Sequence, residues 1–446
     1  MSRLFGTDGV RGRANATLTP ELAMALSSAA VEVLGQSGSP RPHVVVGRDP
    51  RASGEMLESA VCAGLSSAGA DVTVFGILPT PAVAHLTKAT GADFGVMISA
   101  SHNPMPDNGI KFFAFGGRKL PDATEDAIAQ AMEDVRPRPQ GENIGRVVRD
   151  DTGVAQYVSH LVEATPVSLQ GLKVAVDTAN GAAWRAAPDA LARAGADVVA
   201  IHHEPDGLNI NDNCGSTHMD DLRETVLSTG ADVGIGLDGD ADRCLAVDSS
   251  GSFVDGDAIM AILAHAMNQS GDLASSTLVT TVMSNLGLHQ AMAKAGIAIE
   301  TTAVGDRYVL ERLMSDNFSL GGEQSGHLVM PAFATTGDGT LTALQLLSCM
   351  VRSGQTLAEL ASIFTAAPQV LINVTVTDKT VINSPLVRSR VTEWEEKLGS
   401  EGRILLRPSG TEPLVRVMVE ATEVARAQQI ADDIVSAVEK AVDTAG

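Results

Sequence analysis

A four-residue signal recurs along the chain and separates apolar runs from the segments before them. AGAD or TGAD begins at positions 68, 90, 194 and 229, and the runs that follow are VTVFG, FGVMIS, VVAIH and VGIGL. A glycine after a helical stretch is the expected C-cap, and a β-rich run after it reads as a strand. The pattern therefore predicts repeated units of helix, turn and strand.

Four further runs extend the pattern: HVVVG from 43, LKVAVD from 172, LVTTVM from 278 and IAIETTAV from 297. Helices and strands that alternate in this way predict α/β layers with mostly parallel sheets. The pattern changes after residue 370, where VLINVTV is followed by ILLRPSGTEPLVRVMVE and a last helix. Four apolar residues at four-residue spacing predict one buried stripe on that helix: Ile430, Ile434, Val438 and Val442. This tail is expected to be a small α+β domain.

Breaks in composition divide the chain, which at 446 residues is too long for a single core. RPRPQGENIG at 136–145 is polar and rich in Pro and Gly, so it reads as a linker, and softer breaks lie at 249–257 and 366–370. The sequence thus predicts three similar α/β domains with mixed, mostly parallel sheets and a smaller C-terminal α+β domain. The expected boundaries are 1–150 for domain I, 151–253 for domain II, 254–368 for domain III and 369–446 for domain IV.

The composition indicates a globular protein, with 44% hydrophobic and 19% charged residues. A formal charge of -22 argues against sequence-independent nucleic-acid binding, which needs a basic face. An anionic small substrate stays possible, because salt screens exposed charges beyond roughly 8 Å and a local arginine cluster can dominate.

The chain shows no signal for a membrane or for disulfides. No apolar run approaches the roughly 18 residues of a membrane span, and MSRLFGTDGVRG lacks the apolar core of a signal peptide. The cysteines form no CxxC pair and are expected to be free or buried thiols: Cys62, Cys214, Cys244 and Cys349. We expect a soluble cytoplasmic protein with neither nucleic acid nor membrane as a partner.

The strongest chemical signal is GLDGDADRC, which begins at residue 236. It contains an acidic triad at alternate positions: Asp238, Asp240 and Asp242. In an extended segment these side chains would point to one side, and three such carboxylates repel one another unless a cation holds them. An EF-hand is excluded because Arg243 occupies its glycine position and Ser249 its final glutamate. A Mg²⁺ site at a strand end is favoured over an acidic surface turn.

Arg243 directly follows the triad. A metal and an arginine together supply the fixed positive charge that a phosphoryl group needs during transfer.

RPSGTEPLVR, which begins at 407, has the composition of an anion site. Arg407 offers a planar fork of donors, Ser409 and Thr411 offer hydroxyls, and Gly410 lets backbone N–H groups turn toward a ligand. A hairpin turn is the alternative, since Pro, Ser and Gly form turns.

Two other polar stretches could contact a ligand. GGEQSGHLV gathers Glu323, Ser325 and His327, which would share one side of an extended segment and suit sugar hydroxyls, although an edge strand with polar residues is equally consistent. FGTDGVRG, near the N-terminus, carries Asp8 and Arg11 among glycines that allow close approach to a ligand.

ISASHNPMPDNGIKFF, at 98–113, offers Ser99 or Ser101 as a nucleophile. It lacks the G-x-S-x-G elbow of a hydrolase. A serine near a divalent metal could instead carry a phosphoryl group, and Lys111 could move a proton or neutralise charge. The residues alone leave the choice of serine open.

These five segments resemble those of the α-D-phosphohexomutase superfamily. FGTDGVRG, SASHNP, DGDADR, GEQSGH and RPSGTEP occur in the family's order and extend over essentially the whole chain. The resemblance implies four domains around one central cleft, and a phosphoserine at Ser101 that completes the Mg²⁺ site with the acidic triad. It implies that Arg11, His102 and Lys111 assist proton transfer, with Lys111 favoured as the base.

The resemblance also assigns binding roles. Sugar hydroxyls would be bound by Glu323, Ser325 and His327, and phosphate by Arg243, Arg407, Ser409, Gly410, Thr411 and Arg416. Phosphoserine 101 would donate its group to O1 of a 6-phosphate, and a sugar 1,6-bisphosphate, which is also the activator, would turn in the cleft and return the other phosphate.

The expected substrate follows from Gln324 and from TTGDG at 335–339, which resemble the glucosamine branch. That branch implies conversion of glucosamine 6-phosphate to glucosamine 1-phosphate for UDP-N-acetylglucosamine synthesis, by an enzyme expected to be a homodimer. Phosphomannomutase or phosphoglucomutase specificity is the alternative, and a non-catalytic sensor or a Mg²⁺-dependent phosphatase is a more distant one.

Overall fold

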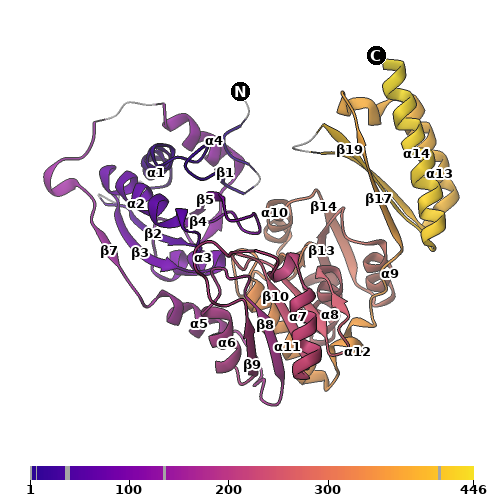
Figure 1. Ribbon diagram of the computed structural model, residues 1–446, viewed down its shortest axis with the longest axis horizontal. Coiled ribbons are helices and arrows are strands. Elements are labelled where there is room, and N and C mark those ends of the chain that lie inside the picture. The colour runs from indigo at the N-terminus through magenta and orange to yellow at the C-terminus, as the bar shows by residue number, and fades with distance from the viewer. Residues whose placement is uncertain (1–2, 7, 36–40, 134–136, 410–412, 446) are drawn as a thin grey trace. The chain divides into compact units, whose positions relative to one another are not determined.

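The computed structural model describes residues 3–6, 8–35, 41–133, 137–409 and 413–445 (Figure 1). These divide into two compact units: Met1–Met283 with Gly296–Ile363, and Ser284–Ala295 with Phe364–Gly446. The first unit contains three sheets and the second contains one.

The first sheet is mixed. Its strands are β1 (Val10–Arg13), β2 (His43–Arg48), β3 (Asp71–Ile77), β4 (Phe94–Ile98), β5 (Asp107–Ala114), β6 (Arg118–Lys119) and β7 (Val147–Arg149). Its helices are α1 (Pro20–Leu34), α2 (Ser53–Ser67), α3 (Thr80–Ala89) and α4 (Asp122–Ala131), and a 3-10 turn, η1, covers Gly141–Asn143. The order is β1-β5-β4-β2-β3-β7, with β6 on β5. β4, β2, β3 and β7 run parallel, and the pairs of β5 are antiparallel.

Helices α1, α2 and α4 cover one face of this sheet, and Figure 1 shows α3 across the sheet from them. Leu26 and Val61 from the helices pack with Phe94 from β4 in the same core. Helices α1 and α2 can approach closely because Gly64 of α2 faces α1, where a Cβ would lie 2.4 Å from the Met24 carbonyl oxygen.

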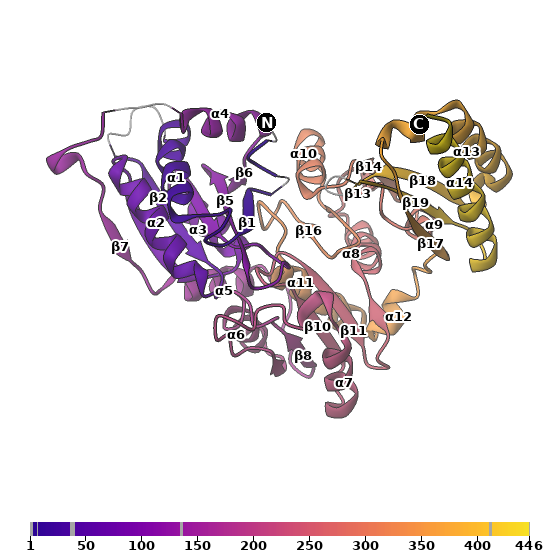
Figure 2. The same cartoon turned by 45° about the horizontal axis from the view of Figure 1, so that its top comes forward.

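The second sheet follows a helix, α5 (Gly153–Glu163). The segment that forms this sheet and its helices contains, in order, β8 (Lys173–Asp177), α6 (Ala186–Arg193), β9 (Asp197–Ile201), η2 (Gly215–Thr217), α7 (Asp220–Thr229), β10 (Val233–Leu237), β11 (Cys244–Asp248) and β12 (Phe253–Val254). The order is β12-β11-β10-β8-β9, with β10, β8 and β9 parallel. Leu222 and Val226 of α7 pack against this sheet, and Figure 2 shows that helix beside β10 and β11.

The third sheet is smaller. Its elements are α8 (Gly256–Ser270), η3 (Ala274–Ser276), β13 (Thr277–Thr281), β14 (Ala298–Thr302), α10 (Asp306–Asp316), β15 (Gly321–Gly322), β16 (Leu328–Val329), α11 (Gly339–Ser353) and α12 (Leu357–Ala361). The order is β14-β13-β15-β16, parallel except for the hairpin of β15 and β16.

The second unit is an antiparallel sheet with helices. It contains α9 (Leu286–Lys294), β17 (Gln369–Thr375), η4 (Lys379–Asn383), α13 (Pro385–Leu398), η5 (Gly399–Glu401), β18 (Arg403–Pro408), β19 (Leu414–Glu420) and α14 (Val424–Ala445). The strand order is β17-β19-β18, and α13 and α14 share one core with the sheet (Figure 1). The predicted stripe of α14 is confirmed, because Ile430, Ile434 and Val438 are buried there and Val442 packs against them.

The recurring tetrapeptide has the predicted role. Its glycines end α2, α3, α6 and α7 with φ of +96°, +65°, +108° and +64°: Gly69, Gly91, Gly195 and Gly230. Each lies a few residues before β3, β4, β9 or β10. Glycine adopts this left-handed conformation without a Cβ penalty, so the repeat marks the turn of each unit.

The predicted fold class is confirmed. Three α/β segments, each with its own sheet and helices, precede a smaller antiparallel α+β unit. All four cysteines are free and buried, as expected. No described helix has the length and apolar character needed to cross a membrane.

Candidate active site

Ser101 lies in the turn between β4 and β5 and faces the acidic triad. Its Oγ donates a hydrogen bond of 2.6 Å to Asp238 Oδ2 and lies 3.3 Å from His102 Nδ1. Its side chain is buried, and its φ of +52° places a non-glycine residue in the left-handed region. The turn thus directs this hydroxyl at the carboxylates of the acidic triad.

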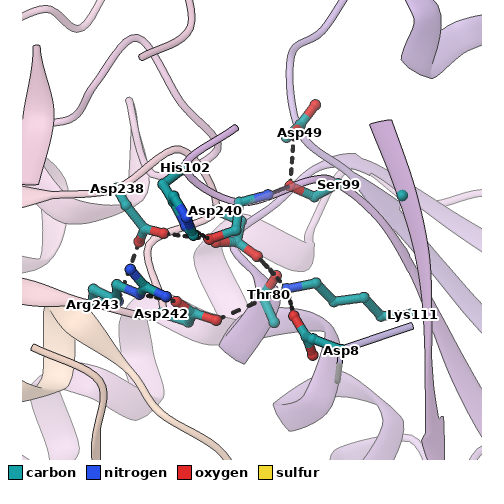
Figure 3. A network of polar contacts seen from close by, with 12 residues as sticks. Asp8, Asp49, Thr80, Ser99, His102, Lys111, Asp238, Asp240, Asp242 and Arg243 are labelled. Atoms are coloured by element: carbon teal, nitrogen blue, oxygen red, sulfur yellow. Dashed lines mark hydrogen bonds and ion pairs between the residues drawn. The ribbon is translucent and has the colours of Figure 1, made fainter. Parts of the chain in front are cut away.

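Ser99 has a different partner. Its Oγ donates to Asp49 Oδ2 at 2.6 Å and accepts from the Ser101 backbone N–H at 3.0 Å. Figure 3 shows Ser99 and Asp49 together, away from Asp238 and Asp242. Of the two candidate serines, only Ser101 reaches the triad.

The triad carboxylates converge, but not through an extended strand. Residues 238–243 form a turn between β10 and β11, in which Ala241 has φ of +57° and its N–H donates to the Asp238 carbonyl oxygen at 2.9 Å. One carboxylate oxygen from each aspartate lies within 4.8 Å of the others. The expected grouping is correct, whereas the alternation expected to produce it is wrong, because the left-handed residue folds the loop back.

The triad has the properties of a site for a hard divalent cation. All three side chains are buried, and Asp240 Oδ1 accepts no hydrogen bond from any residue that the structure describes. Burial, and then the charges of Asp242 and Asp240, raise the pKa of Asp238 to about 8. Carboxylate oxygens are ligands that Mg²⁺ prefers, so these residues fit the ion implied by the resemblance.

A second cluster has metal-type side chains but is already satisfied. Asp177 lies near His202 and Cys214. Its oxygens accept hydrogen bonds from His202 Nδ1 at 2.9 Å, from the Ala179 N–H at 2.8 Å and from the Gly215 N–H at 2.9 Å. We assign it a structural role in holding the loops after β8 and β9.

Lys111 on β5 brings positive charge to the triad. Its Nζ lies 2.6 Å from Asp8 Oδ2, 2.8 Å from Asp240 Oδ2 and 3.9 Å from Asp242 Oδ2 (Figure 3). Burial alone would lower the pKa of this ammonium, but Asp240, Asp8 and Asp242 outweigh burial and raise it. In this arrangement Lys111 is charged, and the neighbouring carboxylates hold its proton firmly.

Arg11 and His102 complete the set of residues expected to assist proton transfer. Arg11 Nη2 donates to Asp8 Oδ2 at 2.8 Å, and the pKa of Arg11 is raised because Asp8 and Asp240 outweigh burial. Burial, Arg243 and Arg11 lower the pKa of His102 to about 4, so its imidazole is neutral at pH 7. His102 therefore lies beside Ser101 as a neutral imidazole, and its lowered pKa makes it a weak base.

A series of charged contacts connects Asp8 to the third sheet through Lys119 and Asp306, which lie in none of the five motifs. Lys119 Nζ lies 3.0 Å from Asp8 Oδ1 and forms an ion pair with Asp306. Asp306 Oδ2 lies 3.5 Å from His327 Nε2, and His327 Nδ1 lies 3.6 Å from Asp242 Oδ1. Sequence reasoning missed Lys119 and Asp306 because they are far apart in the chain and neither lies in a recognisable pattern.

The GEQSGH stretch is a tight turn between β15 and β16, neither of the extended forms considered from sequence. Gly326 has φ of +90°, its N–H donates to the Glu323 carbonyl oxygen at 3.0 Å, and the Glu323 N–H donates to the His327 carbonyl oxygen at 3.0 Å. His327 is buried against the triad, while Ser325 Oγ has no partner among the described residues.

This turn is joined to the acidic loop. The Cys244 N–H donates to the Gly326 carbonyl oxygen at 2.9 Å, directly after Arg243. The pKa of Arg243 is raised because Asp238, Asp242 and Glu323 outweigh burial. Arg243 thus lies between the metal-type ligands and the residues expected to bind sugar.

The predicted anion site of the second unit contains two opposed arginines. Arg407 on β18 is paired directly with Arg416 on β19. Burial and Arg416 lower the pKa of Arg407, whose buried Nε has no hydrogen-bond partner among the described residues. Ser409 is buried beyond the strand end, where its carbonyl accepts from Lys379 Nζ at 2.5 Å.

Gly410 and Thr411 lie outside the described residues. Like charges opposite one another destabilise a sheet, so a bound anion would relieve the pair Arg407 and Arg416.

Four models of phosphoglucomutase/phosphomannomutase domains match the chain in order. The α/β/α domain I model matches residues 2–138, domain II 155–251, domain III 255–367 and the C-terminal domain 371–437. A phosphoglucosamine mutase of Saccharopolyspora erythraea is 63% identical over 97% of this chain and 98% of its own length.

The chain belongs to the phosphoglucosamine mutases of this family. A phosphoglucosamine mutase of Mycolicibacterium gilvum is 61% identical over 97% of this chain and 98% of its own length. A phosphoglucomutase/phosphomannomutase family protein of Burkholderia thailandensis superposes with a TM-score of 0.83 at 25% identity, over 99% of this chain and 98% of that one.

An N-acetylphosphoglucosamine mutase of Aspergillus fumigatus, solved with GlcNAc-6P and magnesium, superposes with a TM-score of 0.70 at 18% identity. It covers 98% of this chain and 96% of that one, and at this identity the likeness is one of fold.

Proposed function

We propose that the protein interconverts glucosamine 6-phosphate and glucosamine 1-phosphate through a phosphoserine at Ser101. The observation that carries the proposal is the hydrogen bond of 2.6 Å from Ser101 Oγ to Asp238 Oδ2, within a buried acidic triad. A plain serine is a weak nucleophile, but one beside a cation site can hold and release a phosphoryl group.

The proposed cofactor is Mg²⁺, held by Asp238, Asp240, Asp242 and the Ser101 phosphate. When bound, it would supply positive charge that stabilises the oxygens of the transferring phosphoryl group. Arg243 would add a second positive charge at the same group, since its own charge is stabilised by the surrounding carboxylates. A sugar 1,6-bisphosphate is the proposed intermediate and activator.

Transfer breaks the bond between Ser101 Oγ and phosphorus and forms a bond from phosphorus to the sugar oxygen. The sugar hydroxyl loses a proton to a base and Ser101 Oγ regains one from an acid. His102, neutral beside Ser101, could accept the first proton, and the charged Lys111 could supply the second. Arg11 keeps its proton, so it is suited to neutralise negative charge on the transferring group. The favoured choice of Lys111 as the base would require it to lose its proton despite the carboxylates around it.

The proposed binding residues lie in two places. In the first unit, Glu323, Ser325 and His327 would bind sugar hydroxyls beside the triad. In the second unit, Arg407, Arg416 and Ser409, with Gly410 and Thr411, would hold the phosphate that is not reacting. Either phosphate of the bisphosphate must fit this second site, because the two exchange roles in each cycle.

Three further expectations stay proposals. The domain boundaries are proposed near residues 150, 253 and 368, and the active protein is proposed to be a homodimer in the cytoplasm. Glucosamine is favoured over glucose and mannose by membership of the phosphoglucosamine mutases, with relatives about 60% identical over nearly the whole chain.

The test is a side-by-side assay of the full chain on glucosamine, glucose and mannose 6-phosphates with Mg²⁺ and a trace of sugar 1,6-bisphosphate. Formation of the glucosamine 1-phosphate at the highest kcat/KM supports the proposal. Inorganic phosphate released faster than the 1-phosphate forms would indicate a phosphatase. No 1-phosphate from wild type, with Ser101→Ala behaving identically, would overturn it.

A further inference from the structure

Two side chains donate hydrogen bonds to carbonyl oxygens of the Ser101 turn. Arg51 Nη2 donates to the carbonyl oxygens of Ser101 and Asn103 at 2.9 and 2.8 Å. Asn211 Nδ2 donates to the same two oxygens at 2.8 and 3.0 Å. We call these four hydrogen bonds the carbonyl clamp.

The two donors of the clamp belong to different sheets. Arg51 follows β2 of the first sheet and is fixed by an ion pair of 2.8 Å with Asp49, both fully buried. Asn211 follows β9 of the second sheet, and its N–H donates to the Ala179 carbonyl oxygen at 2.9 Å. The clamp therefore sets the Ser101 turn relative to the sheet that carries the acidic triad.

Asn211 is suited to this place by its backbone as well as its amide. Its φ is +58°, a left-handed conformation that asparagine tolerates better than most residues. In this conformation the side-chain amide reaches the Ser101 turn while the backbone N–H is bonded to the loop after β8.

The clamp also touches the acidic loop. Gly239 lies between Asp238 and Asp240, and a Cβ there would be 2.6 Å from the Ser101 carbonyl oxygen and 2.7 Å from Asn211 Nδ2. The absence of a side chain at Gly239 is what lets the nucleophile turn, the clamp and the metal-type ligands lie in direct contact.

We propose that Asn211 is a positioning residue for phosphoryl transfer at Ser101, an inference that rests on the proposed function. Ser101 sits in a left-handed conformation that is strained for a non-glycine residue, so other contacts must hold it there. Without the Asn211 amide, each carbonyl keeps only its bond to Arg51, and the turn relaxes. A shift of about 1 Å in a reacting atom can lower the rate about 100-fold.

Asn211 is not among the residues proposed to bind sugar or phosphate, and its amide donates to backbone carbonyl oxygens of the Ser101 turn. Loss of the amide should therefore lower kcat and leave KM for the sugar phosphate nearly unchanged. A merely structural role would instead lower the fraction of folded enzyme, or alter both constants.

Asn213 provides a matched control two residues away. It also has a left-handed φ, of +52°, but it is exposed and its Nδ2 donates only to Asp212 Oδ1 among the described residues, at 3.0 Å. Glycine at either position removes an amide and relieves the same backbone conformation, so only the clamp distinguishes the two variants.

The experiment compares wild type, Asn211→Gly, Asn211→Asp and Asn213→Gly in steady-state assays at saturating Mg²⁺ and bisphosphate. Both Asn211 variants should lose at least 10-fold in kcat with KM within two-fold of wild type, and Asn213→Gly should match wild type. Asn211→Asp keeps the size and backbone tolerance of asparagine, so it tests the amide even if the glycine variant folds poorly.

Three outcomes would overturn the inference: kcat of a folded Asn211 variant within two-fold of wild type, an equal loss in Asn213→Gly, or a loss carried by KM. An inactive wild type would instead contradict the proposed function, so the two failures are distinguishable.

Discussion

Ser101 Oγ donates its hydrogen bond to Asp238 Oδ2, whereas the neighbouring candidate, Ser99, donates to Asp49 on the other side of the turn. The two serines lie on one short turn, yet only one of them faces the triad. This relationship answers a question that the residues alone left open, and it makes a direct prediction for the two alanine variants.

Ser101→Ala should lower mutase activity by at least about 1000-fold, because it removes the atom that carries the phosphoryl group. Ser99→Ala should keep the phosphoserine and lose only about 10-fold, since it loosens the support of the Ser101 N–H. Intact mass and steady-state assays of both variants check this. A Ser101→Ala protein that still gains the mass of one phosphoryl group from bisphosphate would contradict it.

Asp238→Asn should separate stability from activity. The substitution removes a carboxyl group whose pKa is raised to about 8 by burial and then by the charges of Asp242 and Asp240. In EDTA the variant should melt higher than wild type, by about 2–4 °C for each kcal/mol of relief. With Mg²⁺ added, wild type should gain Tm and the variant should not, and mutase activity should be lost.

The control for this comparison is Asp272→Asn, which removes an exposed carboxylate from the same unit. It should keep both the activity and the Mg²⁺-dependent rise in Tm. If Asp238→Asn melts below wild type in EDTA, the triad is not under repulsive strain in the metal-free protein.

Much of this arrangement is readable from the sequence, for identifiable physical reasons. The recurring AGAD and TGAD signals located turns because a helix that ends in glycine leaves a local trace: Gly69 and Gly230 both have positive φ. The acidic triad was readable because three carboxylates so close in sequence, between two apolar runs, repel one another unless a cation lies between them.

The remainder depends on contacts between distant segments. Lys119 and Asp306 form an ion pair across 187 positions, and Asn211 reaches the Ser101 turn across 110. Neither pair has a local pattern, because the arrangement of sheets brings the residues together. The grouping of the triad was predicted for the wrong reason, since the left-handed Ala241 and not an extended strand turns the carboxylates together.

Asp338 should make the protein less stable as pH rises from about 4 to about 6. This residue caps α11 and accepts hydrogen bonds from Tyr157 Oη at 2.8 Å, and burial raises its pKa from 3.8 to about 6. Asp338 binds a proton more tightly in the folded protein than in the unfolded protein. Its contribution to the unfolding free energy is therefore fully present below about pH 4. It is lost as pH rises through the folded pKa.

Urea unfolding of wild type and Asp338→Asn from pH 4 to pH 7 measures this contribution. Asparagine can still accept from the Leu341 N–H but carries no charge at any pH. The difference in unfolding free energy between the two proteins should change by on the order of 2–3 kcal/mol in favour of the variant. A difference that stays flat with pH would show that the pKa of Asp338 is the same in the folded and the unfolded protein.

Arg407→Gln should weaken substrate binding while it relieves the repulsion between opposed strands. Arg407 faces Arg416 across β18 and β19, and burial together with Arg416 lowers its pKa. Loss of charge-assisted hydrogen bonds worth about 1.5–3 kcal/mol corresponds to a rise in KM for the sugar phosphate of about 10- to 100-fold. Inorganic phosphate, used as a probe, should raise the Tm of wild type more than that of the variant.

Arg388→Gln is the matched control for this last comparison, because it removes an exposed arginine of α13 whose Nη2 donates to Asn383 Oδ1. It lowers the net positive charge of the same unit by the same amount but leaves the cross-strand pair intact. Its KM and its response to phosphate should match those of wild type. An equal rise in KM for both variants would mean that general charge attracts the substrate, and that the opposed pair does not form a dedicated phosphate site.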